Sequence, residues 1–137
     1  MKLSTRGRYG TLLMIELAKN YGKGPTSMSV VSRNRNISVK YLEHLIIPLK
    51  KGDLITSMRG PKGGHMLTRS PKSITLWDIL LLLESRSSLV DCSCDESVCR
   101  NTKICPVRPV WGEVLNAMMK VFKKTTLEDV LVSHSLE

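Results

Sequence analysis

The sequence has few large aromatic side chains and no long apolar run. Its 137 residues include one Phe, two Trp and three Tyr, so aliphatic side chains and seven Met have to fill the interior. The longest apolar run, residues 79–83, is far shorter than the roughly 20 residues that cross a membrane. The basic start of the chain lacks the apolar segment and cleavage site of a signal peptide. We therefore expect a cytoplasmic protein of one or two small domains, with no membrane contact.

Acidic residues are scarce in only one half of the chain. Residues 1–72 contain fourteen Lys and Arg against three Asp and Glu, a net charge of +11. Residues 73–137 contain seven against nine, a net charge of −2. A basic surface confined to one segment is typical of proteins that bind nucleic acid, whereas a solubilising surface needs no such asymmetry. The sequence predicts a DNA-binding domain over residues 1–72 and a second part over residues 73–137.

Residues 27–51 have the pattern of a helix-turn-helix. Ser27 can cap a short first helix, and Ser38 can cap the second. In the second helix, apolar residues recur at steps of three and four, at Val39, Leu42, Leu45, Ile46 and Leu49. The opposite face carries side chains suited to base edges and phosphates, namely Lys40, Tyr41, Glu43 and His44. We predict that this second helix, with Ser38 at its start, enters the major groove of DNA.

A basic, glycine-rich hairpin follows the second helix. Short apolar segments at residues 54–56 and 65–67 predict two strands, joined by the turn Arg59-Gly60-Pro61-Lys62-Gly63-Gly64. An Arg at a hairpin tip can enter a narrow minor groove, so Arg59 and its neighbours Gly60, Pro61 and Lys62 are candidate DNA contacts. The alternative is a flexible turn without a role in binding. The whole segment predicts a mainly α fold with a small β-hairpin wing, a winged helix-turn-helix.

The first predicted helix, residues 4–22, supplies further candidate contacts. Its first turn places cations and hydroxyls beside a helix N-terminus, an arrangement that binds phosphate. The candidates are Lys2, Thr5, Arg6, Arg8 and Tyr9. The alternative is that these Arg side chains are merely solvated.

The second part of the chain predicts three elements. Thr75 and Asp78 have capping-box spacing before an almost wholly apolar helix, which is expected to be buried or at a subunit interface. Residues 107–124 predict a long amphipathic helix, with an apolar stripe at Val110, Trp111, Val114, Leu115, Met118, Met119 and Phe122. A helix packed on its own core would look similar, but a winged helix leaves little surface for it to cover. We predict a dimerisation helix, followed by a short helix that Thr126 caps.

All four cysteines lie within fourteen residues, at Cys92, Cys94, Cys99 and Cys105, in a predicted loop over residues 88–107. In a reducing compartment such a group indicates metal binding or redox sensing rather than disulfides. The gaps of one, four and five residues contain no C-x-x-C pair, unlike structural zinc sites. Iron–sulfur clusters tolerate such irregular spacing. The alternative is a thiol sensor whose thiolate Arg100 and Lys103 would favour.

Nearly the whole chain resembles the Rrf-type bacterial winged-helix regulators. The resemblance is carried by residues 1–9 (MKLSTRGRY), 37–43 (ISVKYLE), 59–64 (RGPKGG) and 126–129 (TLED), and by the cysteine segment. It implies a homodimeric transcription factor that binds a pseudo-palindromic operator in double-stranded DNA. An enzyme is not expected, because the sequence has no glycine-rich nucleotide loop and no paired acid–base constellation.

The IscR-like branch of these regulators implies an iron–sulfur cluster, of the [2Fe–2S] type, held by Cys92, Cys99 and Cys105. It also implies that Glu43 reads bases in the major groove. The sequence departs from the branch at Arg108, where relatives carry a His ligand, and at the extra thiol of Cys94. A guanidinium has no lone pair for a metal, which leaves Cys94, an acidic side chain or an exogenous group as the fourth ligand.

The main prediction is therefore a repressor or activator that senses iron–sulfur cluster status. Its further partners would be iron–sulfur assembly proteins or a regulatory protein. The alternative is a cluster-free regulator of the CymR kind, controlled by a partner protein or a thiol redox switch.

Overall fold

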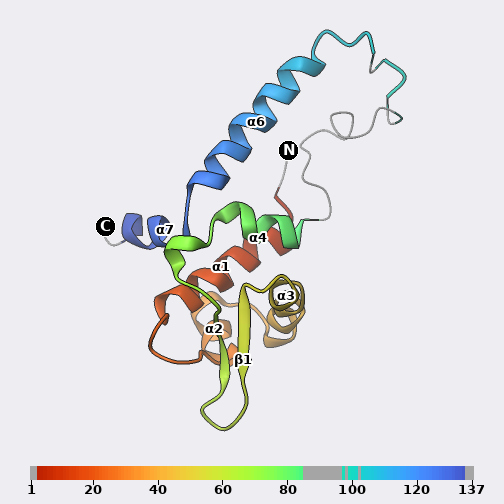
Figure 1. Ribbon diagram of the computed structural model, residues 1–137. Helices are drawn as coiled ribbons and strands as arrows, with labels where there is room; N and C mark the ends of the chain where they lie inside the picture. Colours follow the sequence, from red (N-terminus) through yellow and green to blue (C-terminus); the bar gives the residue numbers. More distant parts are fainter. Residues whose placement is uncertain (1–2, 85–96, 98, 102, 135–137) are drawn as a thin grey trace.

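The computed structural model describes residues 3–84, 97, 99–101 and 103–134. The elements follow one another as α1 (Thr5–Lys19), α2 (Met28–Arg35), α3 (Val39–Lys51), β1 (Ile55–Met58), β2 (Gly64–Leu67), the 3-10 turn η1 (Pro71–Ser73), α4 (Leu76–Leu83), α6 (Arg108–Lys124) and α7 (Leu127–His134) (Figure 1). The described part is mainly helical, with a two-stranded antiparallel sheet. The predicted mainly α fold with a hairpin wing is confirmed.

Hydroxyl side chains start the helices at the predicted positions. Ser27 caps α2 and Ser38 caps α3, each by accepting a backbone N–H of the first turn. Thr75 and Asp78 form a complete capping box at α4, with hydrogen bonds of 2.9 and 3.2 Å. Between α2 and α3 the chain turns at Asn36, whose left-handed backbone (φ 53°) is tolerated by Asn better than by most residues. These local signals fix the helix-turn-helix.

One hydrophobic core joins α1, α2, α3, the base of the wing, α4 and α7. Its largest fully buried side chains are Leu13, Met14, Leu17, Leu42, Leu45, Leu49, Leu54, Ile55, Ile74, Ile79, Leu83 and Leu127. Burying one such aliphatic side chain contributes about 1.5–3 kcal/mol, so aliphatic residues replace the missing aromatic ones. Four of the five residues predicted for the inner face of α3 are buried, but Val39, in its first turn, is 41% exposed.

The wing is a hairpin with one further segment along its edge. Ile55 pairs with Leu67 at its base, where both side chains are buried. Thr26 and His65 exchange two backbone hydrogen bonds of 2.9 Å, which adds the segment before α2 to the sheet. A Cβ on Gly64 would lie 2.4 Å from the carbonyl oxygen of Thr26, so this close approach requires glycine. The wing is thereby held against the helix-turn-helix.

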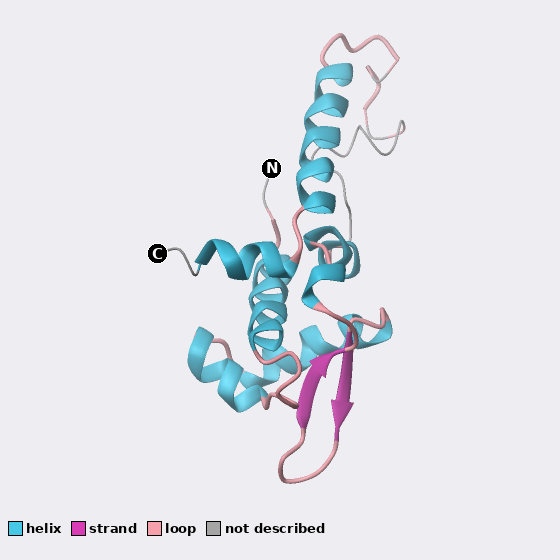
Figure 2. Ribbon diagram, turned by 60° about the vertical axis from the view of Figure 1, so that its left-hand side comes forward, coloured by secondary structure: helices cyan, strands magenta, loops and turns pink. Residues whose placement is uncertain are grey.

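α6 leaves the body and carries no buried residue. It begins at Arg108, one residue after the predicted start, and points away from the end of the molecule that carries the wing (Figures 1 and 2). At its base, Lys123 Nζ lies 5.3 Å from the ring centroid of Trp77 on α4. An isolated bridge between Thr75 and Thr126 ties the starts of α4 and α7 together beside it.

α4 and α7 come from the second part of the chain but share the core with α1, through Ile79, Leu83 and Leu127. The division of the chain at residue 72 into two functional parts stays a prediction. Among the described residues, no helix has the length and apolar character needed to cross a membrane.

Candidate nucleic-acid interface

The outer face of α3 is open to solvent. Lys40, Glu43 and His44 are exposed and Tyr41 is half-buried, whereas Leu42 and Leu45 on the inner face anchor the helix in the core. Ser38, which caps α3, is also exposed. A helix held from one side that presents polar side chains on the other is the arrangement of a recognition helix in the major groove.

A groove of about 650 Å³ lies between this face of α3 and the wing. It is lined by Lys40, Glu43, His44, Ile46, Ile47, Lys50, Lys51, Ser57 and His65. Three Lys and two His against one Glu give it a basic character. The sequence analysis did not assign Lys50, Lys51, Ser57 or His65 to the interface. The helical period could have added Lys51, whereas Ser57 and His65 reach the groove only through the register of the hairpin.

His65 is held rigidly in this groove. Its backbone is bonded to Thr26, and its ring Nδ1 lies 2.9 Å from Ser57 Oγ. Burial lowers the pKa of His65 below its usual value; the charge of Glu43 opposes this shift and that of Lys50 adds to it. The imidazole therefore stays neutral to a lower pH than a solvated histidine.

The first turn of α1 adjoins α3 through an aromatic pair. The rings of Tyr9 and Tyr41 lie edge to face, with centroids 5.9 Å apart and an interplanar angle of 86°. The guanidinium carbon of Arg8 lies 5.8 Å from the Tyr9 centroid. Thr5, Arg6 and Arg8 are exposed, so the cations of this turn lie beside the recognition helix. Lys2 lies outside the described residues.

The wing tip presents its candidate contacts to solvent. Arg59, Gly60, Pro61 and Lys62 are all exposed, at the end of the hairpin farthest from α6 (Figures 1 and 2). Within the described part of the chain, neither Arg59 nor Lys62 takes part in an ion pair. Their charges are thus available to an outside anion.

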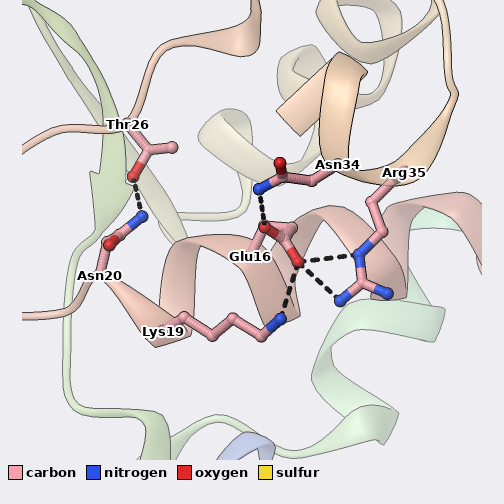
Figure 3. Close-up of polar contacts among 6 residues, drawn as sticks. All are labelled: Glu16, Lys19, Asn20, Thr26, Asn34 and Arg35. Carbon is pink, nitrogen blue, oxygen red and sulfur yellow. Dashed lines mark hydrogen bonds and ion pairs between the residues drawn. The ribbon is translucent and has the colours of Figure 1, made fainter. Parts of the chain in front are cut away.

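A buried carboxylate fastens the helix-turn-helix to α1 (Figure 3). Glu16, 4% exposed, receives Arg35 Nη2 at 2.6 Å and Lys19 Nζ at 3.1 Å on Oε1, and Asn34 Nδ2 at 2.9 Å on Oε2. Burial alone would raise the pKa of Glu16, but the hydrogen bonds from these three side chains outweigh it and lower the pKa. The sequence analysis missed this cluster, because Glu16 lies eighteen and nineteen residues from its partners on α2.

The structure describes only part of the cysteine segment. Cys99 and Cys105 are half-buried, whereas Cys92 and Cys94 lie outside the described residues. The described ranges contain no group of three or more His, Cys, Asp or Glu that could hold a metal ion. At the predicted fourth-ligand position, Arg108 begins α6 and offers no lone pair. Arg108 therefore does not supply the His ligand that the resemblance implies at this position.

The family profile described as Rrf2, iron-dependent transcriptional regulator, matches residues 3–133. The chain belongs to the Rrf2 family. It is 42% identical to the HTH-type transcriptional regulator CymR of Bacillus subtilis over 130 residues, which cover 95% of this chain and 89% of CymR. This Rrf2 protein is therefore a DNA-binding transcriptional regulator, and the predicted resemblance to the Rrf-type regulators is confirmed.

Solved structures of Rrf2 regulators have the same fold. CymR, the global cysteine regulator of B. subtilis, matches with a TM-score of 0.81 at 41% identity, covering 95% of both chains. IscR of T. potens matches with a TM-score of 0.80 at 34% identity, covering 98% of this chain and 88% of its own. CymR of Staphylococcus aureus in its oxidized form matches with a TM-score of 0.75 at 38% identity, covering 95% of both.

Proposed function

We propose that this Rrf2 protein is a homodimeric operator-binding regulator of the CymR kind, controlled by a partner protein or a thiol redox switch. The observation that carries the proposal is its 41% identity to the cysteine regulator CymR over 95% of both chains, against 34% to IscR of T. potens. Arg108 at the expected place of a cluster ligand supports it. A regulator of transcription acts on the chromosome, so the proposed location is the cytoplasm.

In this proposal α3 enters the major groove. Glu43 reads bases there, because a carboxylate can accept a hydrogen bond from N4 of cytosine. Arg59 at the wing tip enters the neighbouring minor groove, where the negative potential favours a cation. Side chains of α3 and the first turn of α1 contact phosphates, namely Ser38, Lys40, Tyr41, His44, Thr5, Arg6, Arg8 and Tyr9.

The apolar stripe of α6 is the proposed dimer interface. α6 carries no buried residue in the single chain, and the stripe residues Val110 and Trp111 are 49% and 38% exposed. Apolar surface of this extent is stabilised by covering it. Two chains joined along α6 would present two recognition helices to half-sites about 34 Å apart, one turn of DNA.

The competing function is an iron–sulfur sensor. The close spacing of Cys92, Cys99 and Cys105 favours it, and it remains chemically reasonable if Cys94 or an exogenous group completes the ligand set. When bound, a cluster would supply a redox-sensitive and oxygen-sensitive centre. This function differs from the CymR kind in a property that is directly measurable, the iron content.

The test is anaerobic purification, followed by an absorption spectrum and by iron and sulfide analysis. We expect a colourless, iron-free dimer that binds a duplex selected from a random-sequence DNA pool. Brown protein with stoichiometric iron and sulfide would replace the proposal by the iron–sulfur sensor. Failure to enrich any duplex, with binding insensitive to salt, would contradict the assigned DNA contacts, because six to ten phosphate contacts lower affinity about 10³–10⁵-fold between 50 and 200 mM salt.

A variant with Cys92, Cys99 and Cys105 all replaced by Ala separates the two forms of control. We expect it to bind the selected duplex as tightly as the wild type under reducing conditions. If peroxide changes binding by the wild type but not by the variant, the input is a thiol switch. If neither responds, the input is a partner protein, which should be sought by its effect on DNA binding.

A further inference from the structure

A hydrogen-bonded contact joins the end of α4 to the beginning of α1, between Glu84 and Ser4, which are eighty residues apart in the sequence. The backbone N–H and the hydroxyl of Ser4 both donate to Glu84 Oε1, at 3.1 and 2.8 Å. The same hydroxyl accepts the N–H of Gly7 at 3.0 Å and so caps α1. Ser4 therefore joins the first turn of α1 to a single carboxylate at the end of α4.

Two glycines allow this contact. A Cβ on Gly7 would lie 2.1 Å from Glu84 Oε1, and a Cβ on Gly10 would lie 2.1 Å from Leu83 Cδ1. Real Cβ atoms do not approach other heavy atoms so closely. A side chain at either position would have to displace the end of the Glu84 or the Leu83 side chain, so glycine at Gly7 leaves the room in which the Glu84 carboxylate meets Ser4.

The same turn of α1 carries part of the DNA-facing surface. Arg6 and Arg8 are exposed, and Tyr9 stacks edge to face on Tyr41 of α3. A displacement of this turn by the size of one methyl group would move the cations relative to the recognition helix. Phosphate contacts fix the register of a protein on DNA, so their position relative to α3 affects affinity.

We propose that Glu84 is a positioning residue for DNA binding, which acts through Ser4 to hold the first turn of α1 beside α3. This inference rests on the proposed DNA contacts of α1. Glu84 is an anion close to a surface that receives phosphates, so its charge alone disfavours DNA. The positioning role therefore has the opposite sign to the electrostatic one: removal of the carboxylate weakens DNA binding instead of strengthening it.

The experiment measures affinity for the selected duplex at several salt concentrations. We expect E84A to weaken binding about tenfold. The slope of log affinity against log salt concentration should fall by the amount that corresponds to one to two phosphate contacts. E84Q keeps an acceptor oxygen for Ser4 and should fall between E84A and the wild type. G7A should weaken binding as E84A does, although Ala favours a helix over Gly, because its Cβ displaces the carboxylate.

The matched control is the cap of α7, which lies away from the interface. Asp129 Oδ2 accepts the backbone N–H of Thr126 at 2.8 Å, and Thr126 Oγ1 accepts the N–H of Asp129 at 3.2 Å. D129A removes a comparable cap and should lower the melting temperature without a change in DNA affinity or salt dependence. A merely structural role for Glu84 predicts the same result for E84A as for D129A.

Two results would overturn the inference. One is unchanged or tighter binding by E84A, and the other is an equal loss of affinity in E84A and D129A. DNA binding by the variant R59A tests the proposed DNA interface independently of Glu84. If R59A also leaves binding unchanged, the assigned DNA interface is wrong, whereas a loss in R59A together with normal binding by E84A contradicts only the role of Glu84.

Discussion

The winged body, which comprises α1 to α4, the wing and α7, differs from α6 in how its apolar side chains are covered. In the body, aliphatic side chains of α1, α3, α4 and α7 bury one another in one core. In α6, seventeen residues with a continuous apolar stripe contain none that is buried. The body is therefore stabilised by contacts within one chain, whereas α6 packs on α4 near Lys123 and Trp77 and leaves part of its apolar stripe exposed, which the proposed dimer would cover.

This contrast between the winged body and α6 separates the proposed DNA-binding surface from the proposed dimer interface. α3 and the wing lie toward one end of the molecule, and α6 extends from the other (Figures 1 and 2). Substitutions in the two regions should consequently differ in kind. Those in the body change unfolding of the chain, and those in α6 change association.

The largest effect is expected in the core of the body. L42A removes a side chain that is fully buried on α3 and should lower the free energy of unfolding by about 3 kcal/mol. Urea denaturation measures this loss, which should be the same at low and high protein concentration. A loss that appears only at low concentration would show that α3 also depends on a partner. It would contradict the view that the body is stabilised within one chain.

The next effect is expected on α6. M118D places a charge in the centre of the apolar stripe and should raise the dimer dissociation constant about a hundredfold or more, because an unpaired charge would be buried at the interface. Sedimentation equilibrium measures the constant. N116D adds the same charge on the exposed polar face and should leave it unchanged. Equal effects of the two variants would contradict an interface on the apolar stripe.

A smaller effect is expected at the buried carboxylate of the body. E16Q removes the charge that Arg35 and Lys19 share and should lower the free energy of unfolding by about 2 kcal/mol. E128Q is the control, because Glu128 meets Lys72 at 3.8 Å on the surface, where an ion pair contributes about 0–1 kcal/mol. Equal losses in the two variants would show that burial of Glu16 adds nothing.

The smallest effects are expected from pH. The pKa of Glu16 is lowered, so its contribution is complete above its usual pKa of 4.5 and is lost as the pH falls below that value. The pKa of His65 is also lowered, so the unfolded chain binds a proton more readily and stability falls as the pH drops below 6.5. Urea denaturation from pH 8 to 3 should show both losses.

Two variants assign these losses. H65Q should remove the decline that begins below pH 6.5, and E16Q should diminish the one below pH 4.5. A decline near pH 6 that persists in H65Q would assign that proton to another group.

Local signals made much of the fold predictable. The caps at Ser27, Ser38 and Thr75, the hairpin turn and the inner face of α3 each depend on residues a few positions apart. The contacts of Glu16 with Arg35 and of Glu84 with Ser4 were not predictable, because no periodicity relates residues so distant in the chain. For the same reason the sequence assigned His65 to a strand but not to the groove beside Glu43. The exposure of the α3 candidates Lys40, Glu43 and His44 was predictable, since it follows from the helical period.

Because α6 packs on α4 near its C-terminal end, a small tilt there produces a larger displacement at its N-terminal end. Its seventeen residues, at 1.5 Å each, make it about 25 Å long. A tilt of about 10° at the contact between Lys123 and Trp77 would displace the far end by about 4 Å, because displacement grows with length. That is more than the 3.4 Å between successive nucleotides of one strand. In the proposed dimer, a tilt too small to disturb the core would therefore change the separation of the two recognition helices by about one base step.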